Sequence, residues 1–129
     1  MADPTRKRVV VTGLGVVTPL GQGIGTFWEN LSSGQCGIGQ VTMFDTGGYA
    51  CTIAGEVRDF DPTPAFPSPK EVRRTDRFTQ LGMMAGWEAL NDSGLDFDRV
   101  NRDRVGAFIG SGIGGLSTLE NQHKTLLER

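Results

Sequence analysis

Glycine is the residue type that most constrains how this chain can fold. It accounts for 19 of 129 residues, about 15% and roughly twice the usual share. Eleven glycines lie in the first 55 residues and eight in the remainder. They stand singly or in pairs beside runs of Val, Ile and Leu, so they do not form a flexible linker. This pattern predicts tight turns and close backbone approaches between apolar segments.

The first half of the chain predicts one buried strand, one helix and a region of loops. Residues 8–12 are a β-branched run, and their continuous apolar character is typical of a strand buried on both faces of a parallel sheet. A helix is expected from Thr26, with Glu29 completing a capping box and Gly34 ending the helix. Prolines between residues 62 and 69 exclude a continuous helix there. Residues 52–57 are the best candidate for a short strand.

The second half predicts two helices and one strand. Apolar residues recur at helical spacing from Arg77, and Gly94 has the position of a left-handed cap. Glycines at 82 and 86 on this helix would let another backbone pack closely. A second buried strand is expected over residues 105–109. Ser117 and Glu120 then form a capping box for a helix that reaches Arg129.

These elements predict an α/β layer structure with a single core. A chain of this length corresponds to one domain and buries about two thirds of its unfolded surface. Strands that alternate with helices of this length imply packed α/β layers. Two strands are few for a sheet, which usually has about four to six. We therefore expect residues 1–129 to be a piece of something larger.

Charge and cysteine content exclude several classes of function. The net charge of −2 removes the usual electrostatic argument for binding nucleic acid. No apolar stretch approaches the roughly 20 residues that span a bilayer, and no secretion signal is expected. Two cysteines and one histidine are too few for a zinc site. A disulfide between Cys36 and Cys51 is open but disfavoured, because nothing points to an oxidising compartment. The chain is interpreted as cytoplasmic, without a metal.

A glycine pattern near the C-terminus leaves nucleotide binding open. Gly110, Gly112 and Gly115 satisfy G-x-G-x-x-G after an expected strand and before an expected helix. Such a turn can place backbone N–H groups against a pyrophosphate. However, no second strand with an acidic ribose-binding residue follows. The competing interpretation is a turn that brings the backbone close to a neighbouring group or ligand.

Two further groups of polar residues have an ordinary and a functional interpretation. Cys36, Cys51 and His123 could supply a nucleophile and a base, but no helix N-terminus is evident beside either cysteine to stabilise a thiolate. Lys70, Arg73 and Arg74 lie three and four residues apart and would share one face of a helical turn. Spacing alone favours a solvated surface for these cations, and the alternative is docking of an acidic partner or phosphate.

Five segments in order resemble the β-ketoacyl-acyl-carrier-protein synthases, and most closely the type II condensing enzymes of bacterial fatty-acid synthesis. The resemblance runs from about residue 6 over essentially the whole chain. The segments that carry it are Val9–Gly21, Phe44–Thr46, Lys70–Asp76, Asp92–Leu95 and Ile109–Gly115. One such motif is weak evidence, whereas five with similar spacing are strong.

The resemblance implies part of a thiolase-like fold, with α-β-α-β-α layers in a homodimeric parent enzyme. It implies decarboxylative Claisen condensation, in which malonyl-carrier protein extends an acyl chain held as a thioester on a cysteine. It also implies two histidines and a lysine in the catalytic site, and no cofactor. None of these four residues matches a position here, so residues 1–129 are expected to be an N-terminal segment that is inactive alone, without the nucleophile or the C-terminal domain.

Two sites carry over from the family by position. Ile113 matches a residue that lines the acyl pocket and gates the entry of longer chains. Lys70, Arg73 and Arg74 match a basic patch that docks the acidic acyl carrier protein, which reverses the preference for a solvated surface. A fragment of a dinucleotide-binding oxidoreductase and a non-catalytic module that binds carrier protein remain as alternatives.

Overall fold

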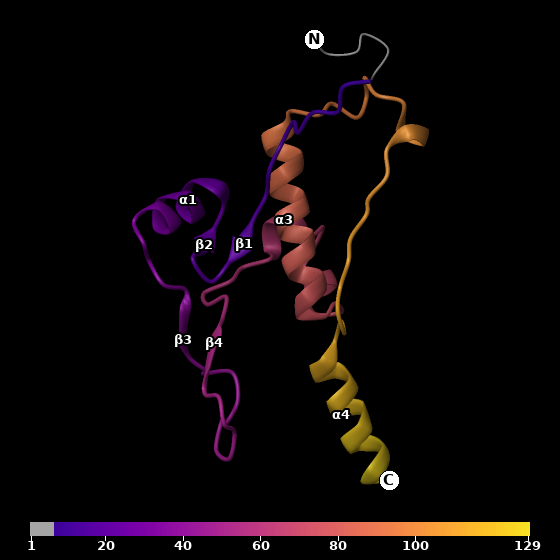
Figure 1. Ribbon diagram of the computed structural model, residues 1–129. Coiled ribbons are helices and arrows are strands. Elements are labelled where there is room, and N and C mark those ends of the chain that lie inside the picture. The colour runs from indigo at the N-terminus through magenta and orange to yellow at the C-terminus, as the bar shows by residue number, and fades with distance from the viewer. Residues whose placement is uncertain (1–6) are drawn as a thin grey trace.

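A computed structural model describes residues 7–129 as four helices, two short hairpin ladders and connecting loops (Figure 1). The strands form two antiparallel pairs, one between β1 and β2 and one between β3 and β4. In chain order the elements are β1 (Val17–Thr18), β2 (Gly21–Gln22), α1 (Ile24–Ser32), β3 (Ile38–Gln40), β4 (Ile53–Gly55), a 3₁₀ turn (Thr63–Ala65), α2 (Pro69–Val72), α3 (Arg77–Ser93), a 3₁₀ turn (Arg102–Arg104) and α4 (Leu116–Leu127).

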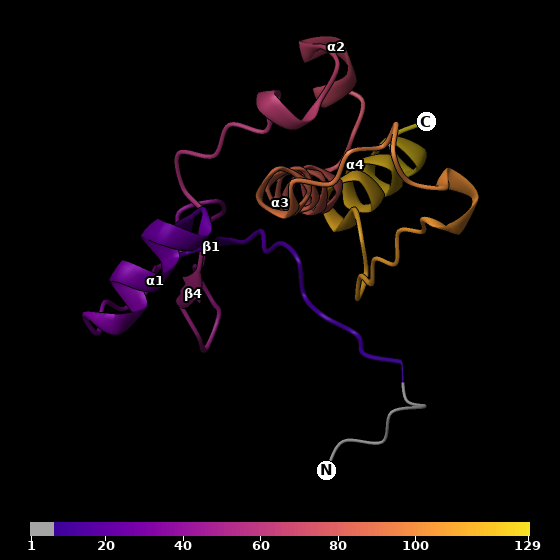
Figure 2. The same ribbon diagram turned by 90° about the horizontal axis from the view of Figure 1, so that it is seen from above.

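Helix α3 is the central element of this arrangement. Seen from above, α1 and the strands lie on one side of α3, and α4 lies on the other (Figure 2). The predicted start at Arg77 is confirmed, and Gly94 ends the helix in the left-handed conformation, with φ of 61° and ψ of 21°. Since glycine has no Cβ, it adopts this conformation without strain, which explains why the sequence located this end correctly.

The prediction of two buried strands from the apolar runs is wrong, within the part of the chain that the structure describes. Residues 8–12 and 105–109 are extended but pair with no strand. Their side chains face solvent, with Val9 96% exposed and Ile109 72% exposed. An apolar run becomes a strand only where a neighbouring strand takes its backbone hydrogen bonds. Of the expected strands, only that over 52–57 forms, shortened to Ile53–Gly55.

The segment after residue 12 packs directly on α3. A Cβ at Gly13 would lie 2.7 Å from Cβ of Ser93, and a Cβ at Gly15 would lie 2.6 Å from the backbone nitrogen of Ala89. These glycines therefore allow a backbone-to-helix contact that any side chain would block. The expectation that Gly82 and Gly86 let another backbone pack closely is wrong. Among residues 7–129, a Cβ on Gly82 would meet only the side chain of Ile109, at 4.0 Å, and a Cβ on Gly86 would meet nothing within 4 Å.

Carboxylates of α3 hold this segment and the start of α1. Glu88 accepts hydrogen bonds from the N–H of Val16 and the N–H of Ile24, each at 2.8 Å. Asp92 accepts from the N–H of Leu14, also at 2.8 Å. The bond to Ile24 satisfies the first residue of α1, whose N-cap Gly23 has no side chain to do so. Helix α3 thus supplies a cap that would ordinarily come from the local sequence.

Both predicted capping boxes are wrong. Helix α1 begins at Ile24, two residues before Thr26, and α4 begins at Leu116, one residue before Ser117. Neither N-cap residue makes a side-chain cap, since both are glycine. A capping box works only when the Ser or Thr is itself the N-cap residue, and here each lies inside its helix. The type of both helices was nonetheless predicted correctly.

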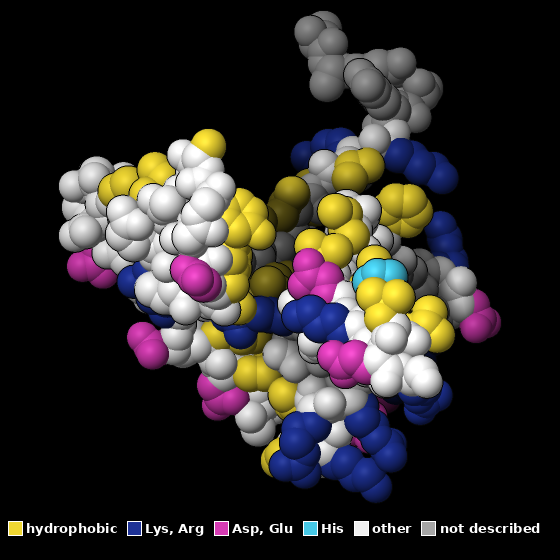
Figure 3. Space-filling model, turned by 90° about the horizontal axis from the view of Figure 1, so that it is seen from below, with side chains coloured by type: hydrophobic (Ala, Val, Ile, Leu, Met, Phe, Trp, Pro, Cys, Tyr) yellow, Lys and Arg dark blue, Asp and Glu magenta, His cyan; other side chains and the backbone are white. Residues whose placement is uncertain are grey.

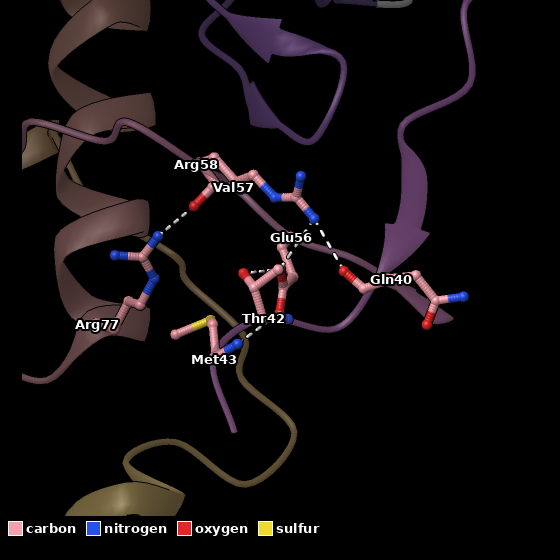
Figure 4. Close-up of polar contacts among 7 residues, drawn as sticks. All are labelled: Gln40, Thr42, Met43, Glu56, Val57, Arg58 and Arg77. Atoms are coloured by element: carbon pink, nitrogen blue, oxygen red, sulfur yellow. Dashed lines mark hydrogen bonds and ion pairs between the residues drawn. The ribbon is translucent and has the colours of Figure 1, made fainter. Parts of the chain in front are cut away.

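The β3–β4 hairpin is held by a carboxylate with four donors (Figure 4). Glu56 accepts from the N–H of Thr42 at 2.9 Å, the hydroxyl of Thr42 at 2.8 Å and the N–H of Met43 at 3.2 Å. Arg58 donates to Glu56 at 3.3 Å and to the carbonyl of Gln40 at 2.9 Å. The Glu56 side chain is only 6% exposed. The N–H of Thr42, followed by its hydroxyl, lowers the pKa of Glu56 from 4.5 to about 2.

The expected single core is absent from residues 7–129. Pro62 and Ala65 are the buried residues in this range, whereas large side chains such as Phe108 are fully exposed. The accessible surface is 10773 Å², against about 6,700 Å² for a compact monomer of this size. Most apolar surface on this chain therefore lacks an intramolecular partner within the described range. Over the same range, no helix combines the length and apolar character needed to cross a membrane.

Replacing Gly15 by Ala tests the contact between the N-terminal segment and α3. The new methyl group would overlap the backbone at Ala85 and Ala89, so we expect a loss of about 1–3 kcal/mol in the free energy of unfolding. Gly25→Ala is the matched control, because a Cβ there meets nothing within 4 Å and alanine favours helix. Urea unfolding followed by circular dichroism compares the two variants. Equal stabilities would contradict the contact.

The acid limb of the stability profile tests the Glu56 cluster. Because the folded-state pKa is lowered, ionised Glu56 stabilises the fold fully above pH 4.5, and this contribution is lost as the pH falls towards about 2. An NMR titration of the side-chain carboxyl carbon should show this low midpoint. Thr42→Val should raise it, whereas Thr42→Ser keeps the hydroxyl and should not. A wild-type midpoint at 4.5 would disprove the assignment.

Candidate functional site

The basic cluster, defined here as Lys70, Arg73 and Arg74, lies on and just after the single turn of α2. Ser68 begins this helix as its N-cap, accepting from the N–H of Glu71, and Pro69 occupies the first helical position. Both residue types favour a helix start, which explains the turn after a proline-rich loop. All three cations are exposed. In the space-filling view, Lys and Arg side chains gather at the end of the molecule where α2 lies (Figure 3).

The charge of the basic cluster is only partly neutralised. Arg74 lies 3.6 Å from the carboxylate of Glu71, and both side chains are about half exposed. Lys70 and Arg73 have no ion pair among residues 7–129. An exposed pair such as this contributes little to stability. The cluster therefore remains available to an acidic partner.

The backbone around the basic cluster is held to α3 by side-chain hydrogen bonds. The side-chain amide of Gln80 donates to the carbonyls of Val72 and Thr75, each at 3.0 Å. Arg77 donates to the carbonyl of Val57 and lies over the ring of Phe60, 5.2 Å from its centroid. These contacts fix the path of the chain into the first turn of α3. The cations are thus presented from a supported segment and not from a free loop.

Ile113 lies in the glycine loop, defined here as residues 110–115, which leads into α4. Its side chain is 77% exposed. Gly114 follows with φ of 81°, and a Cβ there would lie 3.5 Å from the ring of Phe78. Gly115 lies against the carboxylate of Asp76 so closely that a Cβ would overlap it. The hydroxyl of Thr118 donates to the same carboxylate.

The structure thus brings the two predicted sites to one place, the N-terminal end of α3. The basic cluster leads into Asp76, and the glycine loop touches Asp76 and Phe78. Asp76, Phe78 and Thr118 were not identified from the sequence. The sequence signal for Asp76 was its place as N-cap before a helical pattern, but its partner depends on how α3 and α4 pack.

The geometry of the glycine loop argues against a dinucleotide site. Residues 105–109, which run directly into the loop, form no strand within the described range, and the carboxylate of Asp76 lies at the start of α4. A pyrophosphate would need that helix N-terminus and would be repelled by the acidic group. The nucleotide-binding alternative therefore loses its structural basis.

The thiols and the histidine do not assemble into a catalytic group. Both cysteines are exposed and free, and their Sγ atoms contact the carbonyls of Ile38 and Ile53 at 3.8 and 3.5 Å. His123 is exposed on α4. Neither cysteine lies at a helix N-terminus that could stabilise a thiolate. Among residues 7–129 there is also no group of three side chains suited to a metal ion.

A cavity of about 330 Å³ lies apart from both predicted sites. Its walls come from the β1–β2 hairpin, from β3 and from residues 56–59. Cys36 lines it, as do Glu56 and Arg58, whose charges already engage one another. The sequence offered no signal for this cavity, because its walls come from three separate segments, within residues 18–22, 36–39 and 56–59.

Comparison with known proteins confirms the family resemblance that was identified from the sequence. Residues 6–128 match the family described as "Beta-ketoacyl synthase, N-terminal domain". The 3-oxoacyl-[acyl-carrier-protein] synthase 2 of Synechocystis is 46% identical over 129 residues, which is 100% of this chain and 31% of that protein. The protein of the same name from Staphylococcus aureus strain COL is 44% identical over 123 residues, 95% of this chain and 30% of its own length. This chain therefore spans about 30% of the length of these relatives.

A solved structure extends the similarity to the fold. The chain superposes on the ishigamide ketosynthase/chain length factor with a TM-score of 0.73 and 29% sequence identity, covering 95% of this chain and 31% of that one. The predicted fold class, part of a thiolase-like α/β fold, is thereby confirmed. On this family match and this structural similarity, the chain belongs to the β-ketoacyl synthase family, and residues 6–128 match its N-terminal domain.

Proposed function

We propose that residues 1–129 are the N-terminal segment of a longer 3-oxoacyl-[acyl-carrier-protein] synthase of fatty-acid biosynthesis, called here the complete synthase. The observation that carries this proposal is 44–46% identity to synthases of that name over 95–100% of the chain. The exposed apolar surface supports it, because further polypeptide of the same domain would cover that surface. In this proposal the nucleophile and the C-terminal domain lie outside these residues.

The proposed reaction joins two carrier-bound thioesters. The acyl group passes to a cysteine of the complete synthase and releases the first carrier thiol. Loss of CO₂ from malonyl-carrier protein leaves the bonding electron pair on its α-carbon, which attacks the cysteine thioester. A carbon–carbon bond forms, the carbon–sulfur bond breaks, and the cysteine thiolate leaves. The released product is 3-oxoacyl-carrier protein, two carbons longer than the starting acyl chain.

The role proposed for this chain is to bind and select, not to perform the chemistry. The exposure and separation of Cys36, Cys51 and His123 support this division of roles. Acyl carrier protein, loaded with acyl or malonyl groups, is the proposed partner of the basic cluster. The complete synthase is proposed to act as a cytoplasmic homodimer, with neither nucleic acid nor a membrane as a partner and without a cofactor.

The electrostatics of the basic cluster support docking of an acidic carrier. Lys70, Arg73 and Arg74 are exposed, and Gln80 holds the backbone that carries them. Guanidinium groups can bind carboxylate or phosphate with two parallel hydrogen bonds, and complementary charge accelerates encounter. Ile113 is proposed to line the acyl pocket, where a branched side chain between flexible glycines can change rotamer at low backbone cost.

A catalytically silent module is the second candidate function. This candidate is retained because the chain is structurally similar to a protein whose name includes a chain length factor. Such a module would bind carrier protein or a partner subunit without forming product. Carrier binding without turnover by the complete synthase would support this second candidate.

Product formation is the direct test of the leading proposal. The complete synthase, incubated with acyl- and malonyl-carrier protein, should yield 3-oxoacyl-carrier protein detectable by mass spectrometry, and the 129-residue chain alone should yield none. Replacing Cys36 and Cys51 by Ser in the complete synthase should not reduce the rate. Product from the 129-residue chain alone would show that our division of roles is wrong. Absence of product from the complete synthase would disprove the condensing activity.

Charge reversal tests the docking surface. The triple variant K70E/R73E/R74E of the complete synthase should lower kcat/KM for carrier-bound substrates by on the order of 10–100-fold at low salt, because steering is lost. Its dependence on ionic strength should weaken in parallel. R99E/R104E is the matched control, since both arginines are exposed and lie beyond the other end of α3. An unaltered KM and salt dependence in the triple variant would remove the docking role.

A further inference from the structure

The side chain of Asp76 forms its hydrogen bond with a helix other than the one that Asp76 begins. It is the N-cap of α3, yet its side chain forms no cap hydrogen bond with α3. Instead, its carboxylate accepts from the hydroxyl of Thr118 in the first turn of α4, 42 residues away in sequence. A free N-cap carboxylate ordinarily bonds its own helix. Its use by α4 therefore points to a role between the two helices.

The glycine loop leaves no space between its last residue and Asp76. A Cβ on Gly115 would overlap Oδ2 and the carboxylate carbon of Asp76, and Gly114 packs on the ring of Phe78. By contrast, a Cβ on Gly110 or Gly112 would meet nothing within 4 Å. The loop is thus anchored at its α4 end and open at its other end. Ile113 stands at the boundary between these two parts.

Asp76 also lies close to the basic cluster along the chain. Arg74 and Asp76 are separated by Thr75, whose carbonyl is held by Gln80. The hydroxyl of Thr75 donates to the carbonyl of Val72, which the same glutamine also holds. A displacement of the basic cluster would therefore be passed to Asp76 through a supported turn of backbone. From Asp76, this displacement would reach the glycine loop through Gly115 and Thr118.

We propose that Asp76 is a positioning residue that sets the place of Ile113, acting through Thr118 and Gly115, and so links carrier docking to acyl-chain selection. This inference rests on the proposed function. Asp76 and Thr118 touch no substrate. They determine where the acyl-lining side chain stands while the basic cluster holds the carrier. Loss of the hydrogen bond between Thr118 and Asp76 loosens the glycine loop. Discrimination between short and long acyl chains therefore decreases.

The test measures kcat/KM of the complete synthase for a short and a long acyl-carrier protein. Thr118→Val removes the hydroxyl at nearly constant shape, and we expect it to move the ratio of the two values towards one by about five-fold. Thr118→Ser should restore the wild-type ratio relative to Thr118→Val. The KM for malonyl-carrier protein should not change in either variant, since the basic cluster is intact. A merely structural role would lower all rates together and leave the ratio unmoved.

A double-mutant cycle isolates the contact between Asp76 and Gly115. Gly115→Ala should displace the loop and alter the ratio, because its methyl group meets the carboxylate. Asp76→Ala removes that obstacle, so the double variant should behave as Asp76→Ala alone, a non-additive result. Additive effects would overturn the proposed contact. Should the alanine variants fail to fold by circular dichroism, the Thr118 pair decides the outcome.

Ile113→Phe separates failure of the inference from failure of the proposed function. It should reduce use of long acyl chains by filling the pocket. If it does so while the Thr118 and Asp76 variants keep the wild-type ratio, the positioning role is wrong and the acyl pocket stands. If the wild-type complete synthase forms no product, the proposed function itself fails.

Discussion

The arrangement of this chain depends on carboxylates of α3 that bind backbone N–H groups and a hydroxyl belonging to other segments. Glu88 joins Val16 to the first residue of α1, and Asp92 holds Leu14. Asp76 holds the first turn of α4. Helix starts leave N–H groups without intrahelical partners. Because glycine precedes α1, no N-cap side chain can serve its first N–H, and Glu88 of α3 accepts from that N–H instead.

The same helix determines where the surfaces proposed to be functional lie. Its N-terminal end carries the basic cluster and the glycine loop, whereas the chain segment with Gly13 and Gly15 packs nearer its C-terminal end. Glycine has two roles in this design. At Gly13 and Gly15 it permits a close approach of two backbones, and at Gly114 it allows a positive φ beside Phe78. Both roles bring distant segments within reach of the α3 side chains.

Sequence reasoning was most successful where structure depends on neighbours along the chain. It identified α3, its end at Gly94 and the exposed basic cluster, because helical periodicity and a left-handed cap are local properties. It was wrong about the strands at 8–12 and 105–109, which have no strand beside them in the described range. The antiparallel pairing of β3 with β4 was missed, since each strand has only three residues and includes a glycine.

The sequence by itself determined the family of this protein, its helices and the residue types available for docking an acidic partner. Only the tertiary structure decided which residue caps which helix, and that the basic cluster and Ile113 share the end of α3 at Asp76. The physical reason is that periodicity and turn chemistry act over a few residues. The hydrogen bond from Thr118 to Asp76 instead joins residues 42 apart in sequence and depends on the start of α4 lying beside the start of α3.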